Sequence, residues 1–270
     1  MDHIRWAHGI DFSGAKDAGR KIWVATGLIR DKELEITDCR PAKGLPGSGK
    51  ELHKCLTALV DFISGQRGAI FGIDFPFGLP VSLVREDTWE SFVLSFTNRF
   101  RHPEEFKERC FSAANNRELV RTTDKEQRTP FSPYNLWLYK QTYYGIGHVI
   151  KPLIRQRRVS FLPMQKPITE LSWVIEICPA STLKNSGCNL HYKGKSPGHR
   201  AQRLQILKEI KEIWNVKIPQ YLETEILDNS GGDALDSVIA AFATFSNLPN
   251  LFGPSVSEKR IYMLEGYVYA

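Results

Sequence analysis

Hydrophobic and polar positions along the chain first predict a set of short strands. Three stretches rich in apolar and β-branched residues follow one another with only short turn signals between them, which is typical of a meander: 4–13, 21–29 and 33–38. The apolar runs at 69–74 and 172–177 have the length and the flanking turns of buried strands. The pattern therefore predicts five strands, and the tail at 261–270 is interpreted as one more.

Helical spacing marks other parts of the chain. Apolar positions recur every three or four residues over 51–64, 200–214 and 232–246. The segment 81–168 mixes many aromatic and basic residues without one clear period, and we interpret it as a helical insertion with an irregular middle. A meander followed by strand–helix crossovers predicts an α/β fold, with a mixed sheet flanked by helices in a single domain over 1–270.

Composition and charge narrow the classes of function. The 270 residues include 36 Lys and Arg against 30 Asp and Glu, so the formal net charge is +6. This balance suits a polyanionic partner such as nucleic acid, although ordinary enzymes share it. No apolar stretch has the ~20 residues that cross a membrane, and the five cysteines are widely spaced without a CxxC pair. We therefore expect a cytoplasmic protein with reduced thiols and no membrane partner.

Acidic residues stand at the ends of predicted elements. Asp11 and Asp74 end the first and fourth strands, and Asp233 and Asp236 are three apart at the start of the last predicted helix. Ligands bind at the carboxyl ends of parallel strands, so these acids are expected to meet. Clustered carboxylates need a cation, and Mg²⁺ or Mn²⁺ prefers such hard oxygen ligands. Each acid alone also fits a turn or a helix cap, and only their combination favours a metal site.

Glu176 lies inside the apolar strand at 172–177, where an unpaired charge is costly. Three interpretations stay open for its carboxylate. It is a further metal ligand, it faces solvent, or it pairs with an arginine of the insertion.

Basic residues provide candidate contacts to phosphates of nucleic acid. They fall in two groups: Arg155, Arg157 and Arg158 in the insertion, and Lys193, Lys195 and Arg200 in a later loop. Tyr134, Trp137, Tyr143 and Tyr144 are of the type that stacks on bases, although such aromatics also pack cores. We expect the insertion to lie beside the acids and to present a positive wall to them.

The segment 44–51, GLPGSGKE, has the spacing of a phosphate-binding loop. Glu51 stands where such a loop needs Ser or Thr to hold Mg²⁺. We interpret the segment as a crossover loop.

Short motifs around the acids resemble the domain-of-unknown-function family numbered 429, a family of predicted RNase H-like nucleases. The motifs occur in the expected order: GIDFSG at 9–14, FGIDFPFGLP at 71–80, IEICPAS at 175–181, GGDALDSVIAAFAT at 231–244 and EGYVYA at 265–270, with RTTDKEQRTPFSPYNLWLYKQT at 121–142 similar to one branch. The resemblance implies a five-stranded RNase H-type sheet and metal-dependent phosphodiester chemistry at Asp11, Asp74 and Asp233. Asp236 matches the second acid of the DxxD in Holliday-junction resolvases of that superfamily. Many members have Asp-Asp where this chain has Gly232-Asp233.

The hypothesis from the sequence is a metal-dependent nuclease, a hydrolase of phosphodiester bonds in DNA or RNA that uses Mg²⁺ or Mn²⁺. Asp11, Asp74 and Asp233 are the expected metal ligands, with Asp236 and Glu176 as further catalytic candidates. Two other classes stay open. One is an actin-like phosphotransferase or ATPase, whose core has the same strand order but which usually has two such lobes. The other is a non-catalytic nucleic-acid-binding protein that keeps the fold.

Overall fold

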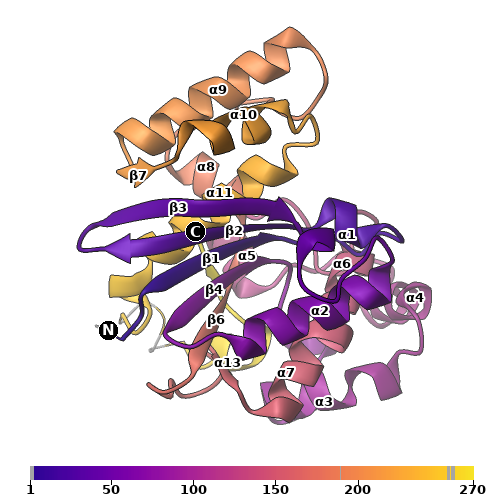
Figure 1. The fold of residues 1–270 in the computed structure, drawn as a ribbon. Coiled ribbons are helices and arrows are strands. Elements are labelled where there is room, and N and C mark those ends of the chain that lie inside the picture. Colours follow the sequence, from indigo (N-terminus) through magenta and orange to yellow (C-terminus); the bar gives the residue numbers. More distant parts are fainter. Residues whose placement is uncertain (1–2, 189, 254–255, 257–258) are drawn as a thin grey trace.

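Eight strands form one mixed sheet in the computed structural model, which describes residues 3–188, 190–253, 256 and 259–270 (Figure 1). Their order across the sheet is β5-β6-β4-β1-β2-β3-β7, and β8 also pairs with β6. The bounds are β1 Trp6–Asp11, β2 Trp23–Arg30, β3 Glu33–Pro41, β4 Ala69–Asp74, β5 Val159–Phe161, β6 Ser172–Ile177, β7 Val216–Lys217 and β8 Val268–Tyr269.

The centre of the sheet follows the predicted meander and crossovers. Strands β1, β2 and β3 are antiparallel neighbours, and β1, β4 and β6 are parallel neighbours. Alternate residues of β4 face opposite sides, since Phe71 and Ile73 belong to one core cluster and Ile70 to the other. Both faces are therefore covered, which explains the continuous apolar runs of β4 and β6.

Helices pack on both faces of the sheet. Figure 1 shows α2 and the helices of the insertion on one face, and the core cluster there joins them. The other cluster joins α9, α10 and α11 to the opposite face. The helix bounds are α1 Ala18–Lys21, α2 Leu52–Gly65, α3 Trp89–Arg99, α4 Pro103–Ala113, α5 Thr122–Glu126, α6 Tyr139–Gly145, a π-helical turn Ile146–Ile150, α7 Lys151–Gln156, α8 Pro179–Asn185, α9 Pro197–Glu212, α10 Gln220–Asp228, α11 Asp233–Ser246 and α13 Tyr262–Glu265.

Three expectations need correction. The sheet has eight strands rather than five, because β5, β7 and β8 add short segments of two or three residues. The insertion at 81–168 is mainly helical as predicted, but it also supplies β5. The tail at 261–270 contains the short helix α13 before its two-residue strand. Within the described ranges, none of the helices combines the length and apolarity required for a membrane span.

Helix α11 lies in direct contact with β1, and Gly9 makes this possible. A Cβ at position 9 would lie 2.1 Å from the backbone nitrogen of Ala241 and 2.1 Å from the backbone oxygen of Ser237. No side chain fits in that space, so the helix backbone rests on the strand. This contact fixes where the N-terminal turn of α11 lies relative to the end of β1.

Candidate carboxylate site

Asp11 and Asp74 form the first half of the site. They are partners in the parallel register of β1 and β4, and each is the last residue of its strand. Residues paired in this way point their side chains to the same face of the sheet. The predicted meeting of these two acids at the carboxyl ends of neighbouring parallel strands is therefore present.

Helix α11 supplies the second half. Asp233 and Asp236 lie in its first turn, and Gly232 precedes them with a φ of +82°. A Cβ on Gly232 would lie 2.9 Å from the ring of Tyr192 and 3.1 Å from the side chain of Lys193. An aspartate at this position would thus be strained and would collide with the loop that covers α11, which gives a physical reason for glycine here.

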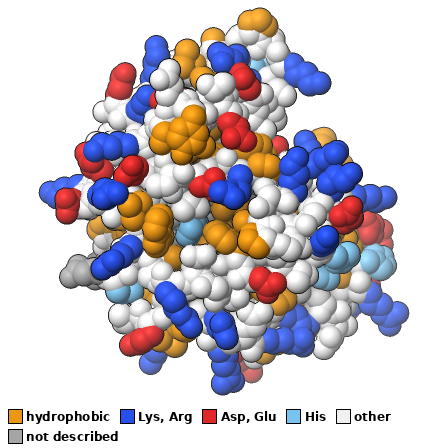
Figure 2. Space-filling view, viewed as in Figure 1, with side chains coloured by type: hydrophobic (Ala, Val, Ile, Leu, Met, Phe, Trp, Pro, Cys, Tyr) orange, Lys and Arg blue, Asp and Glu red, His pale blue; other side chains and the backbone are white. Residues whose placement is uncertain are grey.

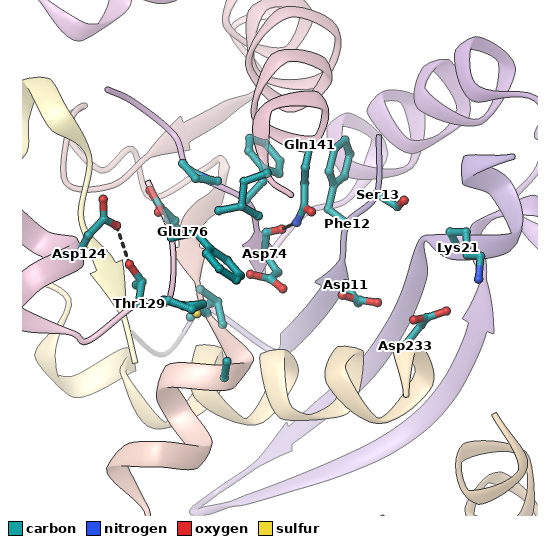
Figure 3. Close-up of a pocket in the computed structure, with 18 of the residues that line it drawn as sticks. Asp11, Phe12, Ser13, Lys21, Asp74, Asp124, Thr129, Gln141, Glu176 and Asp233 are labelled. Atoms are coloured by element: carbon teal, nitrogen blue, oxygen red, sulfur yellow. Dashed lines mark hydrogen bonds between the residues drawn. The ribbon is translucent and has the colours of Figure 1, made fainter. Parts of the chain in front are cut away.

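Asp11, Asp74 and Asp233 line a cavity of about 380 Å³. Figure 3 shows the side chains of Asp74, Asp11 and Asp233 in a row along it. The insertion forms part of the wall, as expected, through a set of residues from 121 to 141: Arg121, Asp124, Thr129, Pro130, Phe131, Leu138 and Gln141. Gln141 donates a hydrogen bond to the backbone oxygen of Asp74, which ties α6 to the end of β4.

Lys193 places its ammonium group among the acids. Its Nζ lies 2.6 Å from Oδ2 of Asp236, and the hydroxyl of Tyr192 donates to the other carboxylate oxygen. Burial alone would lower the pKa of Lys193, but Asp236 and Asp11 outweigh it and raise that pKa. The loop that carries Tyr192 and Lys193 is fixed by the buried side chain of Arg203, which donates hydrogen bonds to the backbone oxygens of Tyr192 and Gly194. Lys193 thus provides the positive charge that the cluster requires.

The carboxylates resist ionisation in this environment. Burial, then Asp236, raises the pKa of Asp74 from 3.8 to about 8, and Lys193 opposes the rise. Burial, Asp236 and Asp74 raise the pKa of Asp11 well above its ordinary value. Burial raises the pKa of Asp233 too, against Lys21 and Lys193. Buried carboxyl groups with strongly raised pKa values in a cleft are typical of functional sites.

These pKa shifts predict a pH dependence of stability in metal-free protein. Folded Asp74 keeps its proton up to a pKa of about 8, whereas the unfolded carboxyl loses it near 3.8. The folded state therefore binds more protons across this window, and the free energy of unfolding falls as the pH rises through it. Asp74→Asn removes this titration. Urea unfolding at pH 5 and pH 8 should show that the stability of the variant relative to wild type grows with pH; a constant difference would contradict the assignment.

Glu176 has a different partner from the other acids. Both of its carboxylate oxygens accept hydrogen bonds from Arg121, at 2.8 and 2.5 Å, and one also accepts from the backbone nitrogen of Phe77. Arg121 also pairs with Asp124, and all three charged side chains are buried. Of the three interpretations of Glu176, pairing with an arginine of the insertion is the one found. Arg121 is the cation that the insertion contributes to the cavity, and it is neutralised by Asp124 and Glu176. The insertion therefore forms no positive wall beside the aspartates.

The aspartate oxygens of the cluster are donor atoms of the kind found in metal sites. Aspartate oxygens are the hard ligands that Mg²⁺ and Mn²⁺ prefer. As arranged, however, no three acidic, histidine or cysteine side chains of the described residues form a group that could hold a metal ion. The ammonium of Lys193 occupies the position next to Asp236 that a cation would take. Its side chain is 57% exposed and has one ion pair, so a cation can replace it without disturbing the core. The ligand types fit a divalent metal, provided that Lys193 moves away.

Most of the predicted nucleic-acid contacts lie away from the cavity. Of the six basic residues, all within the described ranges, Lys193 alone lines it. Arg200 pairs with Asp228 on the surface, and Lys195 and Arg158 are exposed. Arg155 and Arg157 line two other pockets, and neither of these pockets is lined by Asp11, Asp74, Asp233 or Asp236.

The predicted stacking aromatics also divide into two kinds. Tyr134 and Tyr143 are core residues, and Tyr144 is partly buried. Trp137 is 75% exposed and directly precedes Leu138, which lines the cavity. Of the four, Trp137 is therefore the one whose ring is open to solvent.

Several residues of the site could not be identified from the sequence. Arg121, Asp124 and Gln141 reach it from the insertion, Lys21 from α1, and Tyr192 from the loop before α9. Two signals were present in the sequence. The motif at 121–142 contains Arg121, Asp124 and Gln141, although it gave none of them a role, and Tyr192 is an aromatic residue next to a lysine already proposed as a contact. Comparison with known proteins gave no match to a protein-family model, to a curated protein or to a solved structure.

Proposed function

We propose that this chain is a metal-dependent phosphodiesterase of RNase H-like fold that acts on nucleic acid. The observation that carries the proposal is the register of Asp11 and Asp74 at the carboxyl ends of adjacent parallel strands, with Asp233 and Asp236 brought to them by α11. The strand order β3-β2-β1-β4-β6, with an antiparallel meander and parallel crossovers, supports the RNase H-like assignment. So do the ordered motifs that resemble the family of predicted RNase H-like nucleases.

The side chains have separate roles in this proposal. Asp11, Asp74 and Asp233 would hold Mg²⁺ or Mn²⁺, which when bound activates water and stabilises charge on a phosphodiester. Gln141 holds the end of β4 in place through the backbone of Asp74, and so positions its carboxylate. The Arg121–Glu176 pair closes the inner wall of the cavity. Lys193 balances the carboxylate charge until the metal arrives, and its exposed side chain can then turn toward a phosphate of the substrate.

The test measures metal binding and cleavage on the same preparations. Mn²⁺ is titrated by calorimetry into wild type and Lys193→Met, and cleavage of single-stranded, duplex and branched DNA and RNA is followed with and without EDTA. We expect wild type to bind Mn²⁺ and EDTA to abolish cleavage. Lys193→Met should bind Mn²⁺ up to about fivefold more tightly, the equivalent of the ~0.2–1 kcal/mol of an ion pair with an exposed ammonium that no longer competes.

Lys195→Met is the matched control, because Lys195 lies two residues away on the same loop and is exposed. It removes the same charge from the protein without touching Asp236. Equal Mn²⁺ affinity in the two variants would contradict competition between Lys193 and metal. Absence of Mn²⁺ binding in all three proteins would contradict the metal-dependent reaction itself.

One observation favours a non-catalytic nucleic-acid-binding protein as the second candidate. The ammonium of Lys193 forms an ion pair with Asp236, as it would in a protein that keeps the fold but has lost the reaction. In that case wild type would bind nucleic acid with EDTA present and would cleave none of the substrates. The actin-like alternative is less well supported, because the described residues form one sheet rather than two lobes. Hydrolysis of ATP by the purified protein would favour that alternative.

A further inference from the structure

A second pocket of about 510 Å³ lies in the insertion, on the other side of α6 from the carboxylates. Helix α6 separates the two, since its Gln141 lines the carboxylate cavity and its Tyr143 and Tyr144 line this pocket. The remaining walls come from α2, α3, the π-helical turn and α7. We call it the insertion pocket.

The charged side chains around the insertion pocket have one sign. Arg101, Lys151 and Arg155 line it together with three histidines, His53, His102 and His148, and none of the described lining residues is an Asp or Glu. Neither Arg101 nor Arg155 has a side-chain hydrogen bond or ion pair with a described residue. Two acids contact lining residues: Glu104 lies 3.5 Å from His102, and Glu105 accepts a hydrogen bond from the backbone nitrogen of Arg101. The pocket thus concentrates positive potential.

Lys151 is the most informative of these groups. The residue is only 5% exposed, and its ammonium donates to a neutral partner, the hydroxyl of Thr97, at 2.5 Å. Lysines are rarely buried without a carboxylate partner. Burial and the neighbouring Arg155 lower the pKa of Lys151, which shows that the positive charges oppose one another. An anion in the pocket would give the buried ammonium a partner of opposite charge and would reduce its repulsion from Arg155.

The backbone around Lys151 is built to bring these groups together. Residues 146–150 form a π-helical turn, a wide turn that is rare and often occurs at functional sites. Gly147 in this turn lies so close to α3 that a Cβ would be 2.7 Å from the methyl group of Thr97. The same turn places the ring of His148 5.4 Å from that of His53. Figure 2 shows histidine side chains gathered at the right-hand edge of the molecule, where Figure 1 places α4.

We propose that the insertion pocket binds a phosphate monoester group, held by Lys151, Arg101 and Arg155 with the histidines around it. Arginine and lysine both bind phosphate oxygens through charge-assisted hydrogen bonds. The proposal does not depend on the chemistry at the carboxylates. The phosphate has two possible sources, a small phosphorylated molecule or the phosphorylated end of a nucleic-acid strand.

The first experiment titrates pyrophosphate into metal-free, full-length protein by calorimetry. Arg101→Ala/Arg155→Ala removes two exposed cations of the pocket, and Arg5→Ala/Arg67→Ala removes two exposed cations elsewhere. We expect the pocket variant to lose affinity by about tenfold or more, as for the loss of charge-assisted bonds, while the control stays within about twofold of wild type. Equal losses in the two double variants, or no binding to wild type, would overturn the proposal.

The second experiment separates the two sources of the phosphate. A nucleoside monophosphate and matched oligonucleotides with a 5′-phosphate or a 5′-hydroxyl compete with pyrophosphate. A strand end as ligand predicts stronger competition by the 5′-phosphorylated oligonucleotide than by either other competitor. A small ligand predicts competition by the monophosphate, with no gain from the longer chain. In both cases the advantage conferred by the phosphate must disappear in Arg101→Ala/Arg155→Ala, and its persistence there would refute the pocket as the site.

Discussion

Asp11→Asn should abolish metal-dependent cleavage and at the same time make the metal-free protein more stable. The amide keeps the shape of the side chain but removes the charge that binds the metal, so activity should fall by roughly 10²–10³-fold or more. Stability should rise because wild-type Asp11 is crowded by Asp74 and Asp236, and burial and these neighbours raise its pKa well above the ordinary value. Single stabilising substitutions are commonly worth about 0.5–2 kcal/mol.

The measurement combines cleavage rates with urea unfolding in EDTA. Asp61→Asn is the control, because Asp61 is an exposed aspartate on α2, away from the carboxylate cavity. It should change neither property by more than about 0.5 kcal/mol. A fully active Asp11→Asn variant would rule out a direct role for Asp11. An inactive but destabilised variant would show that Asp11 mainly supports the structure.

Arg121→Met should be the most destabilising of the changes considered, at about 3–5 kcal/mol, the usual cost of removing one partner from a buried ion pair. Arg121 is 1% exposed and binds Asp124, Glu176 and the backbone oxygen of Glu265. These partners belong to α5, β6 and the C-terminal helix α13, so the guanidinium joins three segments that are distant in sequence. Its removal leaves two buried carboxylates without a cation.

Chemical unfolding at neutral pH gives the comparison. Arg200→Met is the matched control, since Arg200 forms an ion pair with Asp228 at 3.0 Å with both side chains exposed, and the expected cost is about 0–1 kcal/mol. A triple variant that adds Asp124→Asn and Glu176→Gln to Arg121→Met should recover part of the loss, because it removes the unpaired charges. Similar costs for Arg121→Met and Arg200→Met would show that the buried network contributes little.

Parts of the fold with a strong local signal were predictable from the sequence. The bounds predicted for β4 and β6, 69–74 and 172–177, agree with the structure, because each is a fully buried strand between clear turns. The pairing of Asp11 with Asp74 followed from one rule, that parallel strands place their carboxyl ends together. The strands β5 and β7 could not be predicted in this way, since two or three residues are too few to show alternation, whereas β8 lies in the tail that was interpreted as a strand.

The ion pairs of the site could not be predicted from sequence neighbours. Arg121 and Glu176 are 55 residues apart in the chain, and Lys193 and Asp236 are 43 apart, so only the fold brings each pair together. Glu176 illustrates the limit. Its apolar surroundings in β6 favoured a partner, and an arginine of the insertion was one of three interpretations. Arg121 begins the motif at 121–142, but nothing in the sequence paired it with Glu176.

Gly9 has a consequence for how sequence variation in this protein should be read. It has no side chain and donates nothing to a substrate, yet any Cβ there would push α11 off β1 and carry Asp233 and Asp236 away from Asp11. In a saturation mutagenesis screen, position 9 should therefore tolerate as few replacements as the aspartates themselves. A map of intolerant positions would then include a residue with no chemistry of its own, whose contribution is to leave space.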